Sequence, residues 1–283
     1  MRYFTWLLFL LSVASFPLVV SAQTDDEELS NPLEPKKAPP RIYLGPVAGY
    51  NRSLHSGGFP SISGEASCPK FESGTENGYY FGLTAEYLLG DPKNSNSSVF
   101  VRLTYDYMPA FFNVPGDNYP SNINGTVVNS EIEHTTRIKY PLLNFEAMYK
   151  FNIPGTGFGI TAGPQIGFVM GGEQEQRFTL KFNPEKPVQF SNDDLNKVKP
   201  PVPGFTPEFV DETRTSITLY RGDIIGKESI RFALVGGVQY EILLGKFYLV
   251  PHVLYNFGIT KINNIDNWTV SALQIGVDLR RAF

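Results

Sequence analysis

The sequence is poor in cysteine and in charge, and each shortage excludes a class of protein. Its 283 residues include a single cysteine, Cys68, which excludes an intrachain disulfide framework and any metal site built from several cysteines. Charged residues make up only 18% of the chain, and 24 Lys and Arg stand against 28 Asp and Glu. No basic surface therefore predicts a nucleic-acid partner.

Long apolar runs are also missing beyond the first residues. After residue 22, no stretch reaches the roughly 18 consecutive apolar residues that a membrane-spanning helix needs. The chain has instead 22 Phe, 15 Tyr and 26 Gly, a composition typical of β-rich proteins with many turns. Any membrane that the mature chain spans must therefore be crossed by strands.

The first residues have the three parts of a secretory signal peptide. Arg2 supplies the positive charge, Phe4–Val20 forms an apolar core, and small residues lead up to Ala22. This pattern predicts a signal peptide over residues 1–22, cleaved between Ala22 and Gln23. A retained membrane anchor is the alternative, and the acidic tract that follows at once argues against it.

Residues 23–40 have the composition of a disordered segment. Acidic residues occupy positions 25–28, prolines follow, and almost no apolar side chain is present to bury a core. We expect a periplasmic linker here and one folded domain over residues 41–283.

The final segment, Trp268–Phe283, alternates with period two. Its apolar face runs through Leu273–Leu279, and its other face carries Asp278 and Arg280. Successive side chains of a strand point to opposite sides. Because the segment ends on the aromatic Phe283, we interpret the apolar face as meeting lipid, as in a transmembrane β-barrel.

The same alternation recurs along the domain and predicts an all-β fold, an eight-stranded antiparallel up-and-down transmembrane β-barrel. The expected strands are residues 41–51, 79–89, 99–107, 137–151, 158–170, 230–242, 247–260 and 268–283. The long connections are 52–77, 108–135 and 171–229, and the short ones are 90–98, 152–157, 243–246 and 261–267. Long outer loops that alternate with short periplasmic turns are typical of outer-membrane barrels. A secreted β-sandwich is the alternative, and it gives no reason for this sorting of loop lengths.

The longest connection, residues 171–229, contains two weakly alternating pieces. Arg177–Phe182 and Thr213–Tyr220 each place apolar residues at every second position over a short stretch. We expect them to prolong the flanking strands beyond the membrane as a hairpin.

The inward faces of the predicted strands carry charges of both signs. An eight-stranded barrel has an interior that side chains nearly fill, so we expect a paired polar network without an open channel. Its expected members are Glu86, Arg102, Asp106, Glu146, Arg231, His252, Asp278 and Arg280. Glu86 and Arg102 lie at similar depth from their shared turn, and we expect them to face each other. A narrow, gated ion path is the alternative, and conductance across a planar bilayer would reveal it.

Aromatic residues cluster near both ends of the predicted strands. Near the periplasmic ends lie Tyr43, Tyr87, Tyr149, Phe151, Phe247 and Phe283. Near the outer ends lie Tyr50, Tyr79, Tyr107, Phe168, Phe257 and Trp268. Aromatic rings favour the membrane–water interface, so we expect two aromatic girdles.

Residues 140–151, Tyr-Pro-Leu-Leu-Asn-Phe-Glu-Ala-Met-Tyr-Lys-Phe, resemble the PorT-like outer-membrane β-barrel domain of Bacteroidetes, a porin-family domain. Residues 160–168, 232–240, 254–262 and the closing strand agree with the same pattern. The resemblance covers residues 41–283 and concerns strands rather than catalytic residues. It implies an outer-membrane barrel, some relatives of which serve protein secretion. It also implies that the barrel insertion machinery recognises the terminal aromatic Phe283.

These patterns predict a protein of the Gram-negative cell outer membrane that is not an enzyme and binds no cofactor or metal. We expect a structural or interaction role, in which the lipid-embedded barrel holds the 171–229 loop outside for a protein partner within a secretion assembly. A small porin-like transport channel is the alternative. An outer-membrane hydrolase is a weaker alternative: His55, His134, Asp193 and Asp194 fall in expected outer loops, but catalytic triads are recognised by geometry and not by spacing.

Overall fold

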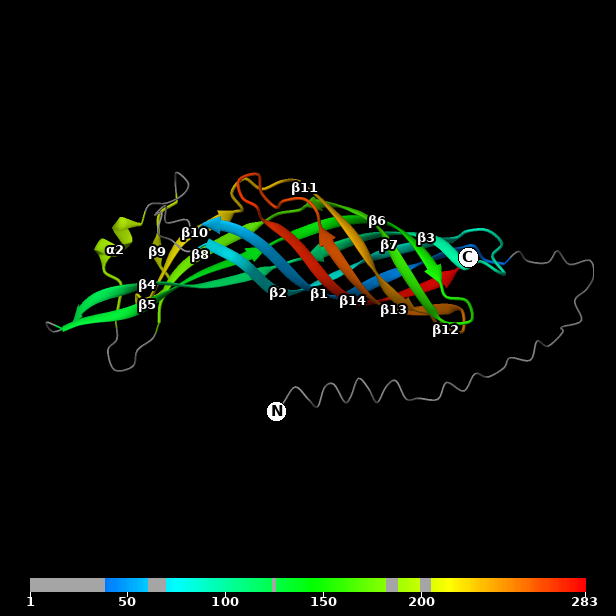
Figure 1. The fold of residues 1–283 in the computed structure, drawn as a ribbon, viewed down its shortest axis with the longest axis horizontal. Coiled ribbons are helices and arrows are strands. Elements are labelled where there is room, and N and C mark those ends of the chain that lie inside the picture. Colours follow the sequence, from blue (N-terminus) through cyan, green and yellow to red (C-terminus); the bar gives the residue numbers. More distant parts are fainter. Residues whose placement is uncertain (1–38, 61–69, 124–125, 182–187, 199–204) are drawn as a thin grey trace, which may run out of the picture. The chain divides into compact units, whose positions relative to one another are not determined.

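The computed structural model describes residues 39–60, 70–123, 126–181, 188–198 and 205–283. Eight strands within them form a barrel: β1 (Ile42–Pro60), β2 (Lys70–Leu88), β3 (Ser97–Tyr107), β6 (Pro141–Asn152), β7 (Phe158–Val169), β11 (Ile230–Tyr240), β13 (Phe247–Gly258) and β14 (Thr269–Ala282). Each pairs antiparallel with both neighbours in that order, and β14 pairs with β1 to close the ring. Figure 1 shows the tilted strands. The predicted eight-stranded antiparallel barrel is confirmed.

The barrel has a short-turn end and a long-loop end. At the short-turn end, tight connections join β2 to β3, β6 to β7, and β11 to β13 by way of β12 (Ile242–Leu244). These turns contain Gly90, Gly155 and Gly245, each with positive φ, a backbone region that glycine adopts without strain. The longer connections all leave from the opposite end, as the sequence predicts.

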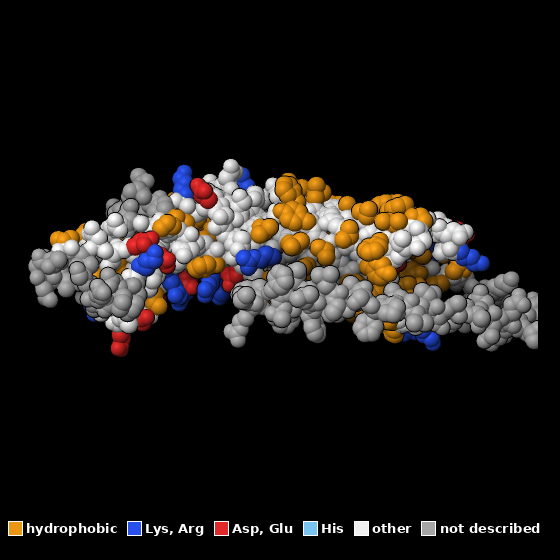
Figure 2. All heavy atoms as spheres, turned by 60° about the horizontal axis from the view of Figure 1, so that its bottom comes forward, with side chains coloured by type: hydrophobic (Ala, Val, Ile, Leu, Met, Phe, Trp, Pro, Cys, Tyr) orange, Lys and Arg blue, Asp and Glu red, His pale blue; other side chains and the backbone are white. Residues whose placement is uncertain are grey.

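The outer face of the barrel is a band of exposed apolar side chains. Representative members, between 37% and 64% exposed, are Phe81, Leu83, Leu103, Phe145, Ile160, Ile166, Leu234, Val238, Val253 and Ile275. Figure 2 shows hydrophobic side chains gathered over the barrel strands. An apolar exterior of this extent on every barrel strand is what contact with lipid requires, so the barrel is a transmembrane one.

Exposed rings flank the apolar band, with two corrections to the prediction. Nine of the twelve predicted girdle rings are at least 42% exposed: Tyr50, Tyr79, Tyr87, Tyr149, Phe151, Phe168, Phe247, Phe257 and Phe283. Tyr107 is half-buried. Tyr43 instead points inward and packs edge-on against Tyr248, with ring centroids 5.4 Å apart. Trp268 is only 1% exposed. Closeness to a strand end does not decide which side of the barrel a ring faces, because alternation along the strand does.

Beyond the level of Tyr50 on β1 and its partner Tyr79 on β2, most outward side chains of the two strands are polar. Arg52 donates from Nη2 to Thr75 Oγ1 at 2.6 Å and from Nη1 to Asn77 Oδ1 at 2.5 Å. Polar side chains on the outward face mark the level at which the lipid-facing band ends. Residues of β1 and β2 beyond this level lie outside the membrane-spanning part.

The predicted loop over residues 52–77 is wrong, because β1 continues to Pro60 and β2 begins at Lys70. The inward side chains here, such as Ser53 and His55, are buried but polar. An alternation of apolar and polar residues therefore never appears in this stretch of sequence, although the backbone pairing continues without a break as far as Ser56.

A second, five-stranded sheet forms at the long-loop end. Its strands, in spatial order, are β4 (Ala110–Ile123), β5 (Thr126–Lys139), β8 (Glu173–Leu180), β10 (Ser216–Asp223) and β9 (Glu208–Phe209). The predicted loop over residues 108–135 is therefore wrong: Ala110 and Phe112 are fully buried, and burying them orders the β4–β5 hairpin. The two pieces predicted to form a hairpin within residues 171–229 do pair, as β8 with β10. They lie in this second sheet, however, and do not prolong the barrel strands β7 and β11.

The predicted strand over residues 137–151 is divided in two. β5 ends at Lys139 in the five-stranded sheet, and β6 begins at Pro141 in the barrel. Between them, the Tyr140 carbonyl accepts a hydrogen bond from the Met108 amide at 2.9 Å. Pro141 has no N–H to offer a sheet partner, so the chain changes sheets at this point.

One short helix, α2 (Asn192–Lys197), lies between β8 and β9 in the described part of the chain. No helix among the described residues is long and apolar enough to cross a membrane. The predicted signal peptide with its cleavage position at Ala22 and Gln23, most of the predicted linker, and Cys68 lie outside the described residues.

Candidate functional site

The barrel interior contains every member of the predicted polar network. All eight predicted residues are buried, with exposures between 0% and 4%, and Lys150 is buried beside them. Within the described residues, the buried charged side chains are four cations and four carboxylates: Arg102, Lys150, Arg231, Arg280, Glu86, Asp106, Glu146 and Asp278. Burying a charge is costly unless it is paired, and here the signs balance.

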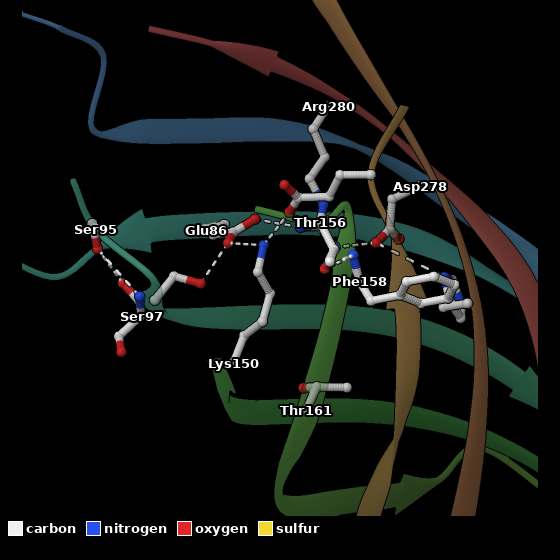
Figure 3. Close-up of polar contacts among 12 residues, drawn as sticks. Glu86, Ser95, Ser97, Lys150, Thr156, Phe158, Thr161, Asp278 and Arg280 are labelled. Carbon is white, nitrogen blue, oxygen red and sulfur yellow. Dashed lines mark hydrogen bonds and ion pairs between the residues drawn. The ribbon is translucent and has the colours of Figure 1, made fainter. Parts of the chain in front are cut away.

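Near the short-turn end, Glu86 binds two cations at once. Lys150 Nζ lies 2.5 Å from Glu86 Oε1, and Arg280 donates to Glu86 Oε2. Ser98 also donates to this carboxylate from its hydroxyl. Lys150 reaches a second carboxylate, Glu241, at the barrel mouth. Figure 3 shows Glu86, Lys150 and Arg280 pointing toward one another from β2, β6 and β14.

Asp278, in the middle of the interior, binds two arginines. It accepts hydrogen bonds from Arg102 Nη2 at 2.8 Å and from Arg280, so Arg280 joins Asp278 to the cluster at the short-turn end. The guanidinium carbons of Arg102 and Arg280 lie 5.1 and 5.4 Å from the centre of the buried Phe100 ring, within cation–π range. Arg102 also lies 3.9 Å from Glu146.

Toward the long-loop end, neutral amides connect the charges. Glu146 accepts from Gln165 Nε2 at 2.7 Å, and Gln165 Oε1 accepts from Arg231 Nη1 at 2.8 Å. Arg231 Nη2 donates to Asn256 Oδ1 at 2.6 Å and to the Val270 carbonyl at 2.7 Å. The network is therefore continuous from the barrel mouth to Arg231.

The remaining predicted members, Asp106 and His252, are also held by uncharged groups. Asp106 accepts from Asn144 Nδ2 at 2.6 Å and from Gln274 Nε2 at 3.2 Å. His252 Nε2 lies 2.6 Å from the Tyr80 hydroxyl. Amide and hydroxyl groups thus satisfy part of the hydrogen-bonding need of the buried charges.

The predicted pairing of Glu86 with Arg102 is wrong by two residues of register. Glu86 lies opposite Phe100, and Arg102 lies opposite Thr84 on β2 and opposite Glu146 on β6. The hairpin turn sets the register of β2 against β3, so two residues at similar depth from the turn need not lie opposite each other.

The prediction also missed several members of the network. Those that join the charged residues are Lys150, Asn144, Gln165, Asn256, Gln274 and Tyr80. All of them occupy inward positions of the same alternation. Most of these side chains carry no charge, so charge alone does not identify them. Their inward position in the alternation of each strand does.

The long-loop end of the interior is closed by a cluster of buried apolar side chains, which we call the apolar plug. Its members are Phe59, Phe71, Met108, Ala110, Phe112, Ile138, Tyr140, Leu142, Ile224, Ile262, Trp268, Val270 and Ala272. The Phe59 ring lies 4.7 Å from the Trp268 ring and 5.0 Å from the Phe112 ring, centre to centre. An ion that entered this cluster would lose its water without gaining polar partners.

His55 lies beside the plug, buried on β1, and not in an outer loop as the sequence predicts. Its Nδ1 accepts from Trp268 Nε1 at 3.1 Å, and its Nε2 lies 3.1 Å from the Met108 carbonyl. This arrangement requires a neutral ring that carries its proton on Nε2. Burial lowers the pKa of His55 to about 3.

A cavity of about 180 Å³ lies at the short-turn end. Its lining includes Tyr43, Tyr248, Glu241, Lys150 and Arg280. The cavity therefore connects that mouth of the barrel to the cluster around Glu86, whereas the opposite mouth contains the apolar plug.

The remaining residues of the hydrolase hypothesis lie on the five-stranded sheet and on α2. His134 is buried on β5, with its ring 4.2 Å from the Phe178 ring. Asp193 and Asp194 lie in the first turn of α2, where Asp194 forms a capping box with Ser191. Within the described residues, no group of three or more His, Cys, Asp or Glu side chains forms a set that could hold a metal ion.

Comparison with known proteins gives likenesses of fold alone. No protein-family model matches the chain, and no curated protein matches it. Neisserial surface protein A is 14% identical, with 86% of this chain and 97% of that chain covered and a TM-score of 0.34. The attachment invasion locus protein Ail of Yersinia pestis is 12% identical, with 85% and 99% covered and a TM-score of 0.33. The outer membrane protease OmpT from Escherichia coli is 9% identical, with 87% and 97% covered and a TM-score of 0.32.

Proposed function

We propose that this protein is a closed barrel of the Gram-negative outer membrane with a structural and interaction role, and that it is neither an enzyme nor an open pore. The observation that carries the proposal is the apolar plug at one end of a buried, charge-balanced interior. Short turns at one end and long connections at the other are the pattern of outer-membrane barrels. We therefore assign the short turns to the periplasm, with export through the predicted signal peptide.

The five-stranded sheet is the part that we propose to bind a partner. A second buried apolar cluster attaches the chain after β8 to this sheet; its members are Leu180, Val188, Phe190, Ile217 and Leu219. The described parts of the 171–229 connection thus form an ordered platform with its own small core. Its proposed partner is a protein, and the PorT-like resemblance suggests a secretion assembly as the setting.

Affinity capture from detergent-solubilised membranes tests the interaction role. The intact chain is compared with a variant in which a short linker replaces residues 171–229. Heat-dependent mobility on gels serves as the control that both barrels are folded. We expect a partner that the intact chain captures and the folded variant does not. Identical captures would show that the platform is not the binding element.

A small transport channel is the second candidate function, and one observation favours it. The cavity of about 180 Å³ gives the periplasmic end of the interior access to solvent. Transport would require the apolar plug to move aside. Conductance in planar bilayers distinguishes this alternative from the closed barrel.

A further inference from the structure

The five-stranded sheet carries an arginine cluster on its exposed face, close to the barrel. The strand register puts Phe111, Arg137, Glu175 and Arg221 in one row across β4, β5, β8 and β10. Arg177 follows two positions after Glu175 on β8, so it shares the same face. Figure 2 shows Lys, Arg, Asp and Glu side chains gathered at this end of the described structure.

Guanidinium groups outnumber carboxylates in the cluster. Arg177 donates to Glu175 Oε1 from Nε and Nη2 at 2.9 and 2.6 Å, and Arg221 donates to the same oxygen at 3.1 and 2.5 Å. Partial burial alone would raise the pKa of Glu175, but these hydrogen bonds hold it below its usual range. Arg137 has no carboxylate partner within the described residues, and its guanidinium lies 5.7 Å from the centre of the Phe111 ring.

A shallow groove of about 60 Å³ runs through the cluster and is lined by Phe111, Thr135, Arg137, Glu175 and Arg177. It offers guanidinium donors and a hydroxyl around a space of limited size. Arginine is the side chain best suited to bidentate hydrogen bonding with phosphate oxygens. The donor set of the groove therefore fits a phosphate group.

The cluster also lies at the level where lipid headgroups are expected. Met170, 62% exposed, is the last apolar outward residue after β7, and Glu175 is five residues further. At about 3.3 Å per residue along a strand tilted by about 45°, this separation corresponds to a height of roughly 12 Å. Long arginine side chains extend from such a position toward the headgroups. In the row nearer the barrel, Lys139 and Glu173 form an exposed ion pair, and Asp223 lies opposite Glu173.

We propose that Arg137, Arg177 and Arg221 bind the phosphate of an anionic glycolipid headgroup in the outer leaflet. The inference rests on the proposed outer-membrane orientation, in which the five-stranded sheet lies outside the cell. The donor set supports the assignment, because Arg137 has no carboxylate partner within the described residues and lines the groove beside Arg177. The place of the cluster just beyond the lipid-facing band favours a membrane lipid over a soluble ligand.

Titration of the purified full chain in detergent tests the proposal, with native mass spectrometry as the readout. The probes are diphosphorylated lipid A and the same lipid with its phosphates removed. We expect the phosphorylated form to bind at least about tenfold more tightly, the effect of about one charge-assisted contact. The double variant R137Q/R177Q should lose this preference. The matched control K181Q/K197Q removes two cations elsewhere on the same outer part and should keep it.

Three results would overturn the proposal: equal binding of the two lipids by the unmodified protein, equal loss in the two double variants, or inorganic phosphate competing as strongly as the phosphorylated lipid. Heat-dependent gel mobility shows whether each variant is folded. A single variant, R221Q, provides a second test that leaves Arg137 and Arg177 in place and should weaken the preference. Conductance and partner capture do not depend on phosphate binding, so the two proposals fail independently.

Discussion

Replacing Asp278 with Asn should destabilise the barrel strongly. Asp278 is 0% exposed and accepts a hydrogen bond from Arg102 at 2.8 Å. Without the carboxylate, the Arg102 guanidinium stays buried with only Glu146 nearby, at 3.9 Å. Leaving one member of a buried ion pair uncompensated costs about 3–5 kcal/mol. Arg280 keeps its bond to Glu86, so the loss falls mainly on Arg102.

A double-mutant cycle with Arg102→Met isolates this interaction. Unfolding by urea in lipid vesicles is followed by the fluorescence of Trp268, which is buried in the plug. The double variant D278N/R102M should lose less stability than the two single variants summed, by about 1–3 kcal/mol. As a control, E173Q in the exposed pair with Lys139 should cost no more than about 1 kcal/mol. Additive losses, or a D278N cost as small as that of E173Q, would refute the charge-balanced interior.

Three further predictions concern the plug and the chain end. The pKa of His55 is about 3 in the folded protein, below its value in the unfolded chain, so the unfolded state takes up a proton between pH 7 and pH 5. Over this range the free energy of unfolding should fall by about 2 kcal/mol more in the unmodified protein than in H55Q. Equal pH slopes in the two proteins would contradict this. Phe112→Ala should cost about 3–5 kcal/mol in the same urea assay, since Phe112 is fully buried; a loss under about 1 kcal/mol would show a loosely packed plug. Deleting Phe283, 62% exposed, should impair membrane insertion in cells more than refolding in detergent, whereas equal losses would contradict its role as an insertion signal.

The membrane-spanning half of the fold could be predicted from the sequence because lipid requires alternation. Exposed apolar residues recur at every second position over Tyr79–Leu83 of β2 and Leu273–Leu279 of β14, so the period-two pattern appears directly in the sequence. The same alternation identified all eight buried network residues by their position opposite the apolar face. Which of them contact one another could not be predicted, because the register of each hairpin depends on its turn, and a shift of two residues moved Glu86 away from Arg102.

The outer half was missed because its strands no longer face lipid. In β1 beyond Tyr50, polar side chains lie on both faces: Arg52 outward, Ser53 and His55 inward. In β4 and β5, the buried residues face a small core, and their neighbours face water. Without a lipid-facing side, the apolar signal weakens, and composition alone suggests loops. The apolar plug depends on contacts between segments far apart in the chain, such as Phe59 with Trp268, which no local pattern records.

Conductance of the purified full chain across a planar bilayer tests the closed-barrel proposal most directly. In this proposal, the apolar plug around Trp268 and the paired charges around Asp278 block the passage of ions. We therefore predict no stable conductance steps at either polarity, in a preparation whose folded state is confirmed by gel mobility. Reproducible unitary steps from the unmodified protein would contradict the closed barrel and favour the transport channel.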